Sequence, residues 1–253
     1  MFGQKAIGMV LFAAMFCGIV WPLNSYAVQV KSTQKAEAIQ TIIAKYPKLS
    51  VGVSVVNIKT GEAININGDR SFVAASTIKV LVAVDYLHQV EKGKYTLKKI
   101  VRGTLAREQL RQMISISNNA SWYAFNDILT YRGEAVYAKS IGITYGWITN
   151  SITPRNMTTL LAKLYRRELL NKEHTNLLLS FMKQTHNMTL IPGSNIKAQT
   201  YNKTGRLDGL VHDTAIVDDG VNQYAIAIFT DGKTTLENRA GLFHEITEAV
   251  MIK

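Results

Sequence analysis

Strand-like patterns occur at both ends of this chain, and the 253-residue sequence has helical periodicity between them. Near the start, apolar residues alternate along Leu49–Asn57, Lys59-Thr60-Gly61 is a turn sequence, and 62–67 continues as a second strand, which predicts a hairpin. Three more strands are predicted near the end, at 198–204, 211–217 and 224–230. We therefore expect one antiparallel sheet built from both ends of the chain.

Amphipathic or apolar helical patterns account for most of the remaining sequence. Thr153-Pro154 is a typical helix start, with a capping hydroxyl and proline at the first helical position. The predicted helices span 32–46, 76–90, 105–116, 120–129, 154–167, 172–183 and 236–251. This order predicts an α+β fold, a three-layer α-β-α sandwich with an added all-helical lobe.

The predicted domain runs from 28 to 253 without repeats, low-complexity segments or linkers. We expect a sheet lobe from 28–70 and 195–253, a helical lobe from about 71–194, and a site in the groove between them.

The first 27 residues have the pattern of a secretory signal peptide. Lys5 precedes an apolar stretch from 6 to 23, and Ser25 and Ala27 are small residues at the minus-three and minus-one positions of a cleavage site. The alternative is a retained membrane anchor, because the apolar stretch approaches the length of a bilayer span. Cys17 is the one cysteine and lies inside this segment, so the mature chain has no thiol chemistry. We expect a periplasmic or extracellular protein.

The charge of the chain is strongly basic, with a formal net charge of +11 at pH 7. An exported basic protein is attracted to anionic surfaces, but no Lys/Arg cluster interleaved with aromatic residues indicates nucleic-acid binding. The histidines are scattered and show no metal-ligand spacing. We therefore expect no nucleic acid, metal or cofactor, and a monomer.

Lys79 lies in an apolar run, 74–84, three residues after Ser76. A helix that is apolar nearly all round is buried, and a buried amine has a lowered pKa. Residues i and i+3 share a helix face, so Lys79 can accept a proton from Ser76. The alternative is that Lys79 extends its ammonium to the surface. Three other Ser-x-x-Lys pairs occur in polar or mixed stretches, starting at Ser32, Ser180 and Ser194.

Two more motifs follow this pair in order. Ser117-Asn118-Asn119 lies between two predicted helices, and Lys203-Thr204-Gly205 ends a predicted strand. An earlier Lys-Thr-Gly at Lys59 is interpreted as the hairpin turn.

With these three motifs in this order, the chain resembles the class A β-lactamases and the related penicillin-binding proteins, over nearly the whole mature sequence. The resemblance implies a fold of the β-lactamase/transpeptidase-like kind. The resemblance implies that Ser76 forms an acyl-enzyme, Lys79 accepts its proton, and Ser117 relays a proton to the departing nitrogen. It also implies a substrate-binding set and an oxyanion hole from the N–H groups of Ser76 and Arg206. The implied substrate-binding residues are Asn119, Lys203, Thr204, Gly205 and Arg206.

The chain departs from the family pattern in two places. Asn118 replaces an aspartate that is a buried structural partner in the family, which affects local packing more than chemistry. Class A enzymes also use a loop glutamate for deacylation. Between the second motif and Thr153 this chain has only Asp127 and Glu134, both in helical-looking segments, and 142–150 contains no carboxylate.

The sequence therefore predicts an exported penicillin-recognising serine hydrolase that is slow at deacylation and acts on β-lactams or peptidoglycan stem peptides. A D-alanyl-D-alanine carboxypeptidase or endopeptidase is the first alternative, and a non-catalytic binder of cell-wall peptide or β-lactam is the second. His212 has two interpretations: it contacts the substrate carboxylate, or it orders the next strand.

Overall fold

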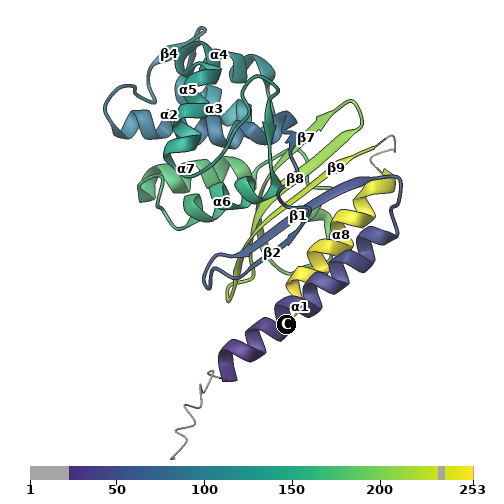
Figure 1. Cartoon of the computed structure of the whole chain (residues 1–253). Helices are drawn as coiled ribbons and strands as arrows, with labels where there is room; N and C mark the ends of the chain where they lie inside the picture. The colour runs from purple at the N-terminus through teal and green to yellow at the C-terminus, as the bar shows by residue number, and fades with distance from the viewer. Residues whose placement is uncertain (1–22, 233–236, 253) are drawn as a thin grey trace, which may run out of the picture.

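A computed structural model describes residues 23–232 and 237–252 of the chain (Figure 1). Most of the signal-peptide prediction lies outside the described residues. The α-helices are, in chain order, α1 (Leu23–Ala44), α2 (Lys79–Glu91), α3 (Ala106–Ser115), α4 (Asn119–Leu129), α5 (Tyr131–Ser140), α6 (Pro154–Tyr165), α7 (Lys172–Lys183) and α8 (Glu237–Met251). Two short 3-10 helices are η1 (Ala75–Ile78) and η2 (Ile191–Gly193).

The main sheet has five antiparallel strands in the order β2-β1-β9-β8-β7. The strands that form it are β1 (Ser50–Asn57), β2 (Ala63–Ile66), β7 (Gln199–Leu207), β8 (Leu210–Asp218) and β9 (Gln223–Asp231). The first two come from the start of the chain and the last three from its end, so the predicted sheet from both ends is confirmed. Strand β9 joins the two halves through its pairing with β1.

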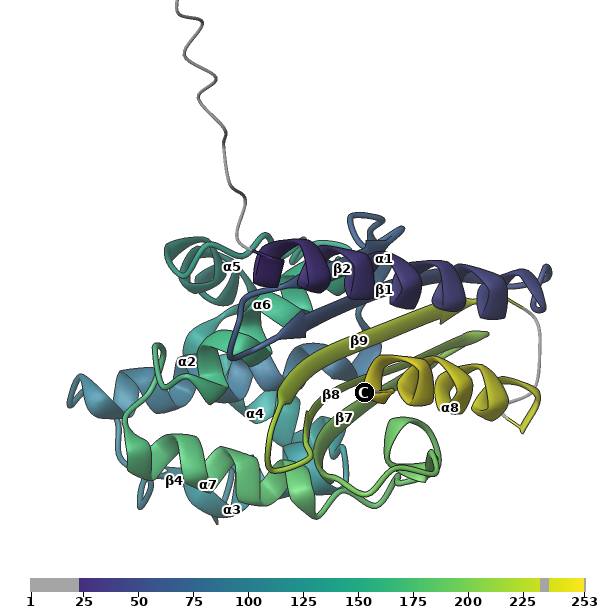
Figure 2. The same ribbon diagram turned by 90° about the horizontal axis from the view of Figure 1, so that it is seen from below.

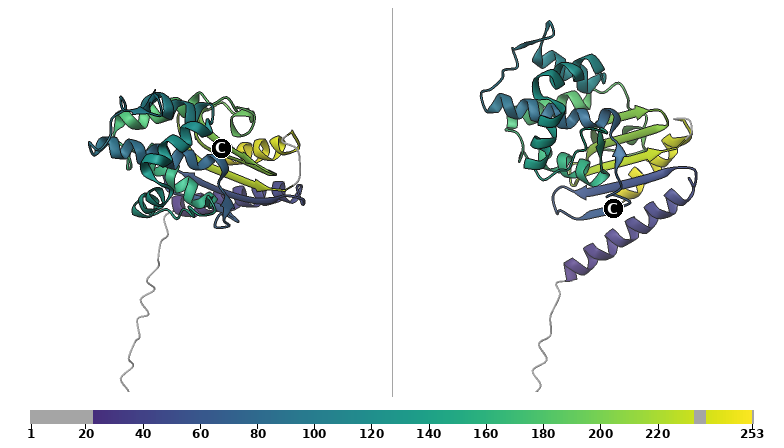
Figure 3. Two further views of the ribbon diagram at one scale, coloured as in Figure 1. Left: turned by 90° about the horizontal axis from the view of Figure 1, so that it is seen from above. Right: turned by 45° about the horizontal axis from the view of Figure 1, so that its top comes forward.

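Alternation along the strands divides the core between the two faces of this sheet. Ala225, Ala227 and Phe229 of β9 pack with the helical lobe, whereas Ile226 and Ile228 pack with α1 and α8. Figure 2 shows α1 and α8 side by side along one face of the sheet. Helix α6 covers the opposite face, so the predicted three-layer α-β-α sandwich is confirmed (Figure 3).

The structure differs from the predicted elements in one whole helix and in several local details. Helix α5 is absent from the predicted helices, although Glu134 within it lies in a helical-looking segment. The first turn of the predicted buried helix is the 3-10 helix η1, and α2 begins at Lys79. Helix α1 begins at Leu23, nine residues before the predicted start. Four two-residue strands were not predicted: β3 (Phe72–Val73), β4 (Ile100–Val101), β5 (Thr104–Leu105) and β6 (Ser151–Ile152). None of the described helices is both long and apolar enough to cross a membrane.

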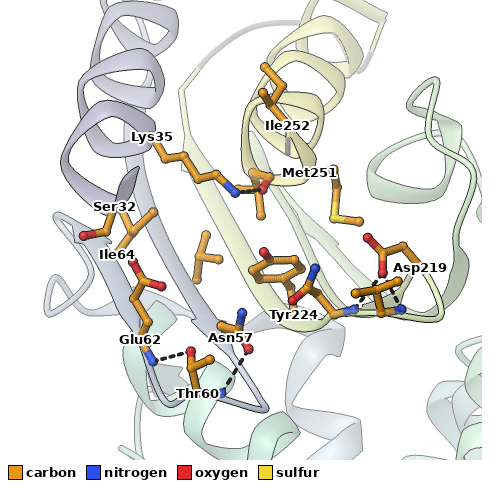
Figure 4. Close-up of a pocket in the computed structure, with 14 residues that line it drawn as sticks. Ser32, Lys35, Asn57, Thr60, Glu62, Ile64, Asp219, Tyr224, Met251 and Ile252 are labelled. Carbon is orange, nitrogen blue, oxygen red and sulfur yellow. Dashed lines mark hydrogen bonds between the residues drawn. The ribbon is translucent and has the colours of Figure 1, made fainter. Parts of the chain in front are cut away.

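A pocket of about 350 Å³ lies between α1, the β1–β2 hairpin and the end of α8 (Figure 4). Lys35, Glu62 and Tyr224 are among the residues that line it, and none of the three sequence motifs contributes to it. It is on the α1/α8 side of the sheet, whereas the motif residues are on the helical-lobe side.

Candidate active site

Ser76 lies in the 3-10 helix η1, directly before α2. In a 3-10 turn the side chains of residues i and i+3 eclipse each other, so Ser76 and Lys79 project from the same side. This turn and the start of α2 are packed into the core: Thr77 and Ile78 are buried, and so is α2 from Lys79 to Leu87. The sequence-predicted pair is therefore on one face of a buried helix start.

Lys79 is fully buried, and the hydrogen bonds that its ammonium makes with the described residues go to neutral groups. Its Nζ donates to the Ser117 carbonyl at 2.7 Å, to the Asn119 Oδ1 at 2.6 Å and to the Ser117 Oγ at 3.3 Å. Burial lowers its pKa to about 8. The side chain does not reach the surface, so the alternative of a solvated ammonium is wrong.

Ser117 lies between two lysines. Its Oγ accepts a hydrogen bond from Lys203 Nζ at 2.9 Å as well as the longer one from Lys79. Its backbone has a φ of +58°, a left-handed conformation that few non-glycine residues adopt. This backbone turn directs both its hydroxyl and its carbonyl to Lys79.

Lys203 comes from the middle of β7 and is almost completely buried. Its Nζ also donates to the Thr204 carbonyl at 2.9 Å. Burial, and after it the charge of Lys79, lowers the pKa of Lys203 to about 7; the buried Asp213 carboxylate acts in the opposite direction. The two ammonium groups on either side of Ser117 form a locally positive site for an anion.

Gly205 allows β7 to lie against η1. A Cβ at this position would be 2.9 Å from the Ala74 carbonyl oxygen and 3.1 Å from the Ser76 nitrogen, too close for any other residue. The strand that carries Lys203 is thereby next to the turn that carries Ser76, although the two are far apart in sequence. Thr204 is buried and its Oγ1 accepts a bond from Asn187 at 3.3 Å, while Arg206 is exposed.

Asn118 caps helix α4. Its Oδ1 accepts hydrogen bonds from the N–H groups of Ala120 at 2.8 Å and Ser121 at 3.3 Å, and its amide donates to Gln112 at 3.1 Å. An asparagine is among the preferred residues at this position. The departure from the usual aspartate therefore leaves the Ser117–Asn119 turn well supported.

His212 is buried on β8 and holds the strand that leads to Ser76. Its Nδ1 accepts from the Thr230 N–H at 3.1 Å, which makes Nε2 the protonated nitrogen that donates to the Val73 carbonyl at 2.9 Å. Burial lowers its pKa to about 4, so the ring is neutral at physiological pH. Of the two sequence interpretations, the structure supports the one in which His212 orders the strands.

Two carboxylates lie between the second motif and Thr153, both before the 142–150 stretch. Asp127 forms an exposed ion pair with Arg102 at 2.5 Å. Glu134 is buried on α5, and neither of its oxygens has a hydrogen-bond partner among the described residues. Burial, and after it the charge of Asp85, raises the pKa of Glu134 to about 8, so it is protonated at neutral pH and is a poor base.

Two neighbours of the motifs were not anticipated from the sequence. The Trp122 ring lies 5.8 Å from Lys79 Nζ, and the signal for it was its position three residues after Asn119 on one helix face. Asn150 contacts the Ala74–Ala75 segment next to Ser76, and its only sequence signal was its place in the carboxylate-free stretch 142–150.

The family follows from the match to a family model. The model of the β-lactamase enzyme family matches residues 34–252. The chain belongs to the β-lactamase enzyme family. The matched stretch contains all three motifs and both lobes.

Solved structures with the same fold include PBP-A and a β-lactamase. PBP-A superposes with a TM-score of 0.79 at 25% identity, covering 86% of this chain and 94% of PBP-A. A mutant of PBP-A, equally similar, is an acyl-enzyme complex with penicillin G. A β-lactamase from Chitinophaga pinensis DSM 2588 has a TM-score of 0.78 at 24% identity, covering 85% and 97% of the two chains, and shows the shared fold. No curated protein sequence matches the chain.

Proposed function

We propose that this member of the β-lactamase family is a serine hydrolase that forms an acyl-enzyme at Ser76 with β-lactams or D-alanyl-D-alanine peptides. The observation that carries the proposal is the bonded set Lys79–Ser117–Lys203 beside the Ser76 turn. The penicillin G acyl-enzyme of a PBP-A mutant supports the same chemistry. We also propose export, which the pattern of residues 1–27 favours.

Acylation uses the neutral form of Lys79. With a pKa of about 8, roughly one Lys79 side chain in ten is neutral at pH 7. The neutral amine accepts the proton of the Ser76 hydroxyl as Oγ attacks the amide carbonyl carbon. The C–N bond then breaks, and the departing nitrogen takes the hydroxyl proton of Ser117. The Lys79 ammonium returns a proton to the Ser117 Oγ along the 3.3 Å hydrogen bond between them.

Binding and charge stabilisation come from β7. Lys203 and the Thr204 hydroxyl attract the carboxylate that β-lactams and D-alanyl-D-alanine ends both carry. The N–H groups of Ser76 and Arg206 are proposed to bind the oxyanion, an element worth about 2 to 4 kcal/mol per donor. The close approach at Gly205 supports this arrangement because it brings β7 next to the Ser76 nitrogen.

Deacylation requires a base that activates water, and the described residues between Asn119 and Thr153 provide no suitable carboxylate. The stretch 142–150 has no carboxylate, and Glu134 is protonated at neutral pH. We therefore propose slow hydrolysis of a β-lactam acyl-enzyme. This observation favours a second candidate, a D-alanyl-D-alanine carboxypeptidase or endopeptidase, for which a penicillin is a long-lived inhibitor.

The test is to incubate the purified protein with a fluorescent penicillin and follow the protein-bound label over time. Ser76→Ala removes the proposed nucleophile. Ser180→Ala is the matched control, because Ser180 also precedes a lysine by three residues but is exposed on α7 and donates to the Leu177 carbonyl at 2.6 Å.

We expect label on the wild type and on Ser180→Ala, and none on Ser76→Ala. Label that persists for hours supports the peptidase, and rapid loss with turnover supports a β-lactamase. Wild type that takes up no label would contradict the serine-enzyme proposal and leave a non-catalytic binder. A Ser76→Ala variant that labels as well as wild type would also contradict the proposal, because the label would then be attached to another residue.

A further inference from the structure

The short segment before Ser76 has an unusual backbone that must be held from outside. Ala75 has a φ of +48°, and the left-handed region is unfavourable for a residue with a Cβ. Such conformations persist where the surrounding structure fixes them. Whatever fixes Ala75 also fixes the direction of the Ser76 N–H and side chain, since the two residues are adjacent.

Asn150 makes two contacts with this segment. Its backbone carbonyl accepts from the Ala74 N–H at 2.6 Å, and its side-chain Nδ2 donates to the Ala75 carbonyl at 3.5 Å. Of the described side chains, that of Asn150 is the one that donates a hydrogen bond to the Ala75 carbonyl. The contact therefore acts on the strained residue itself.

The Asn150 side chain is itself oriented by a neighbour. Its Oδ1 accepts from the Tyr145 hydroxyl at 3.2 Å, and the Tyr145 side chain is buried. Asn150 has a φ of +48°, a region that asparagine tolerates better than most residues. Immediately after it, β6 pairs with β3, Ser151 opposite Val73 and Ile152 opposite Phe72, which brings the 142–150 stretch to the Ser76 turn.

We propose that Asn150 is a positioning residue for acylation. Through the Ala75 carbonyl its amide sets the orientation of the Ser76 N–H and hydroxyl, the groups that act on the reacting carbonyl. It does not touch the groups assigned to the substrate carboxylate, Lys203 and Thr204. The inference rests on the proposed function, because it requires Ser76 to be the acylated residue.

Asn150→Gly is the main variant. Glycine adopts the positive φ without strain and keeps the backbone carbonyl that binds the Ala74 N–H, so only the amide is lost. We expect the acylation rate constant at saturating penicillin to fall roughly three- to tenfold, the usual range for one hydrogen bond, with the non-covalent dissociation constant unchanged. Tyr145→Phe, which removes only the bond that orients the amide, should give a smaller fall in the same direction.

Asn67→Gly is the matched control. Asn67 also has a left-handed backbone, with a φ of +51°, and its amide donates to a backbone carbonyl, that of Val51 at 3.0 Å. It follows β2 and has no bond to the Ser76 turn. Loss of the Asn67 amide should lower the melting temperature about as much as Asn150→Gly does, but should leave the acylation rate constant at the wild-type value.

The experiment is rapid-quench labelling of the purified wild type and the three variants over a range of penicillin concentrations, with melting curves alongside. Wild-type labelling with a selective loss of rate in Asn150→Gly supports the inference. Equal rates for Asn150→Gly and wild type, equal slowing in Asn67→Gly, or weaker binding with an unchanged rate would overturn it. If the wild type is not labelled at all, the proposed function fails and the inference fails with it.

Discussion

Glu134→Gln should stabilise the protein at high pH but not at low pH. The folded state holds Glu134 buried and without a hydrogen-bond partner in the described part of the chain, and its pKa is raised from 4.5 to about 8. Below pH 4.5 the folded and unfolded chains both carry this proton. Between pH 4.5 and 8 the unfolded chain releases it while the folded chain keeps it, so stability falls as pH rises. At 1.36 kcal/mol per pKa unit, the loss approaches about 5 kcal/mol at pH 8.

Glutamine mimics the protonated acid, so the free energy of unfolding of Glu134→Gln should match wild type near pH 4.5 and exceed it by several kcal/mol at pH 8. Urea denaturation at intervals from pH 4.5 to 8 measures this difference. Glu108→Gln is the control: the pKa of Glu108 is held at about 2 by hydrogen bonds from Arg111 and Gln112, so its effect should be constant above pH 5.5. A Glu134→Gln difference that does not change with pH would refute the reasoning.

Three further predictions concern acylation by penicillin. Lys79→Ala should slow acylation by a factor of about 10² to 10⁴, the range for loss of a general base. Lys163→Ala removes another lysine that donates to a carbonyl and should leave the acylation rate unchanged. Quenched labelling compares the two variants. Gly205→Ala places a Cβ 2.9 Å from the Ala74 carbonyl oxygen and should reduce labelling without removing the fold, as circular dichroism can check. As pH rises from 6 to 9, the labelling rate at saturating penicillin should increase, because Lys79 loses its proton. The apparent affinity for penicillin should fall over the same range, because Lys203 loses its charge. A labelling rate that falls with pH would exclude Lys79 as the base.

The sheet and most helices could be predicted because their patterns are local. Strand β9 has apolar residues on both faces from Tyr224 to Phe229, and Pro154 follows a capping threonine, so each element has its signal within a few residues. The first turn of the predicted Ser76 helix is a 3-10 helix instead, because β7 lies directly against it at Gly205. That contact joins residues far apart in sequence and leaves no local signal.

The same distinction applies to the site. Lys79, Ser117 and Lys203 could be found because the resemblance supplied their order, and the structure joins them by hydrogen bonds. The role of Asn150 could not be predicted from the sequence, because it depends on the pairing of β6 with β3, two strands of two residues each. The burial of Glu134 could not be predicted from the sequence either, because a charged residue in an amphipathic helix is normally placed on the solvent face.

The most direct test of the central claim is to locate the penicillin adduct. Trypsin cleaves after Arg70 and Lys79, so Ser76 falls within the peptide 71–79, Ser-Phe-Val-Ala-Ala-Ser-Thr-Ile-Lys. Tandem mass spectrometry of the protein digested after brief exposure to penicillin G should show this peptide heavier by the mass of the intact penicillin, with fragment ions placing the addition on Ser76. An unmodified 71–79 peptide from protein that carries the adduct elsewhere, or an addition on Ser71 or Thr77, would contradict the account.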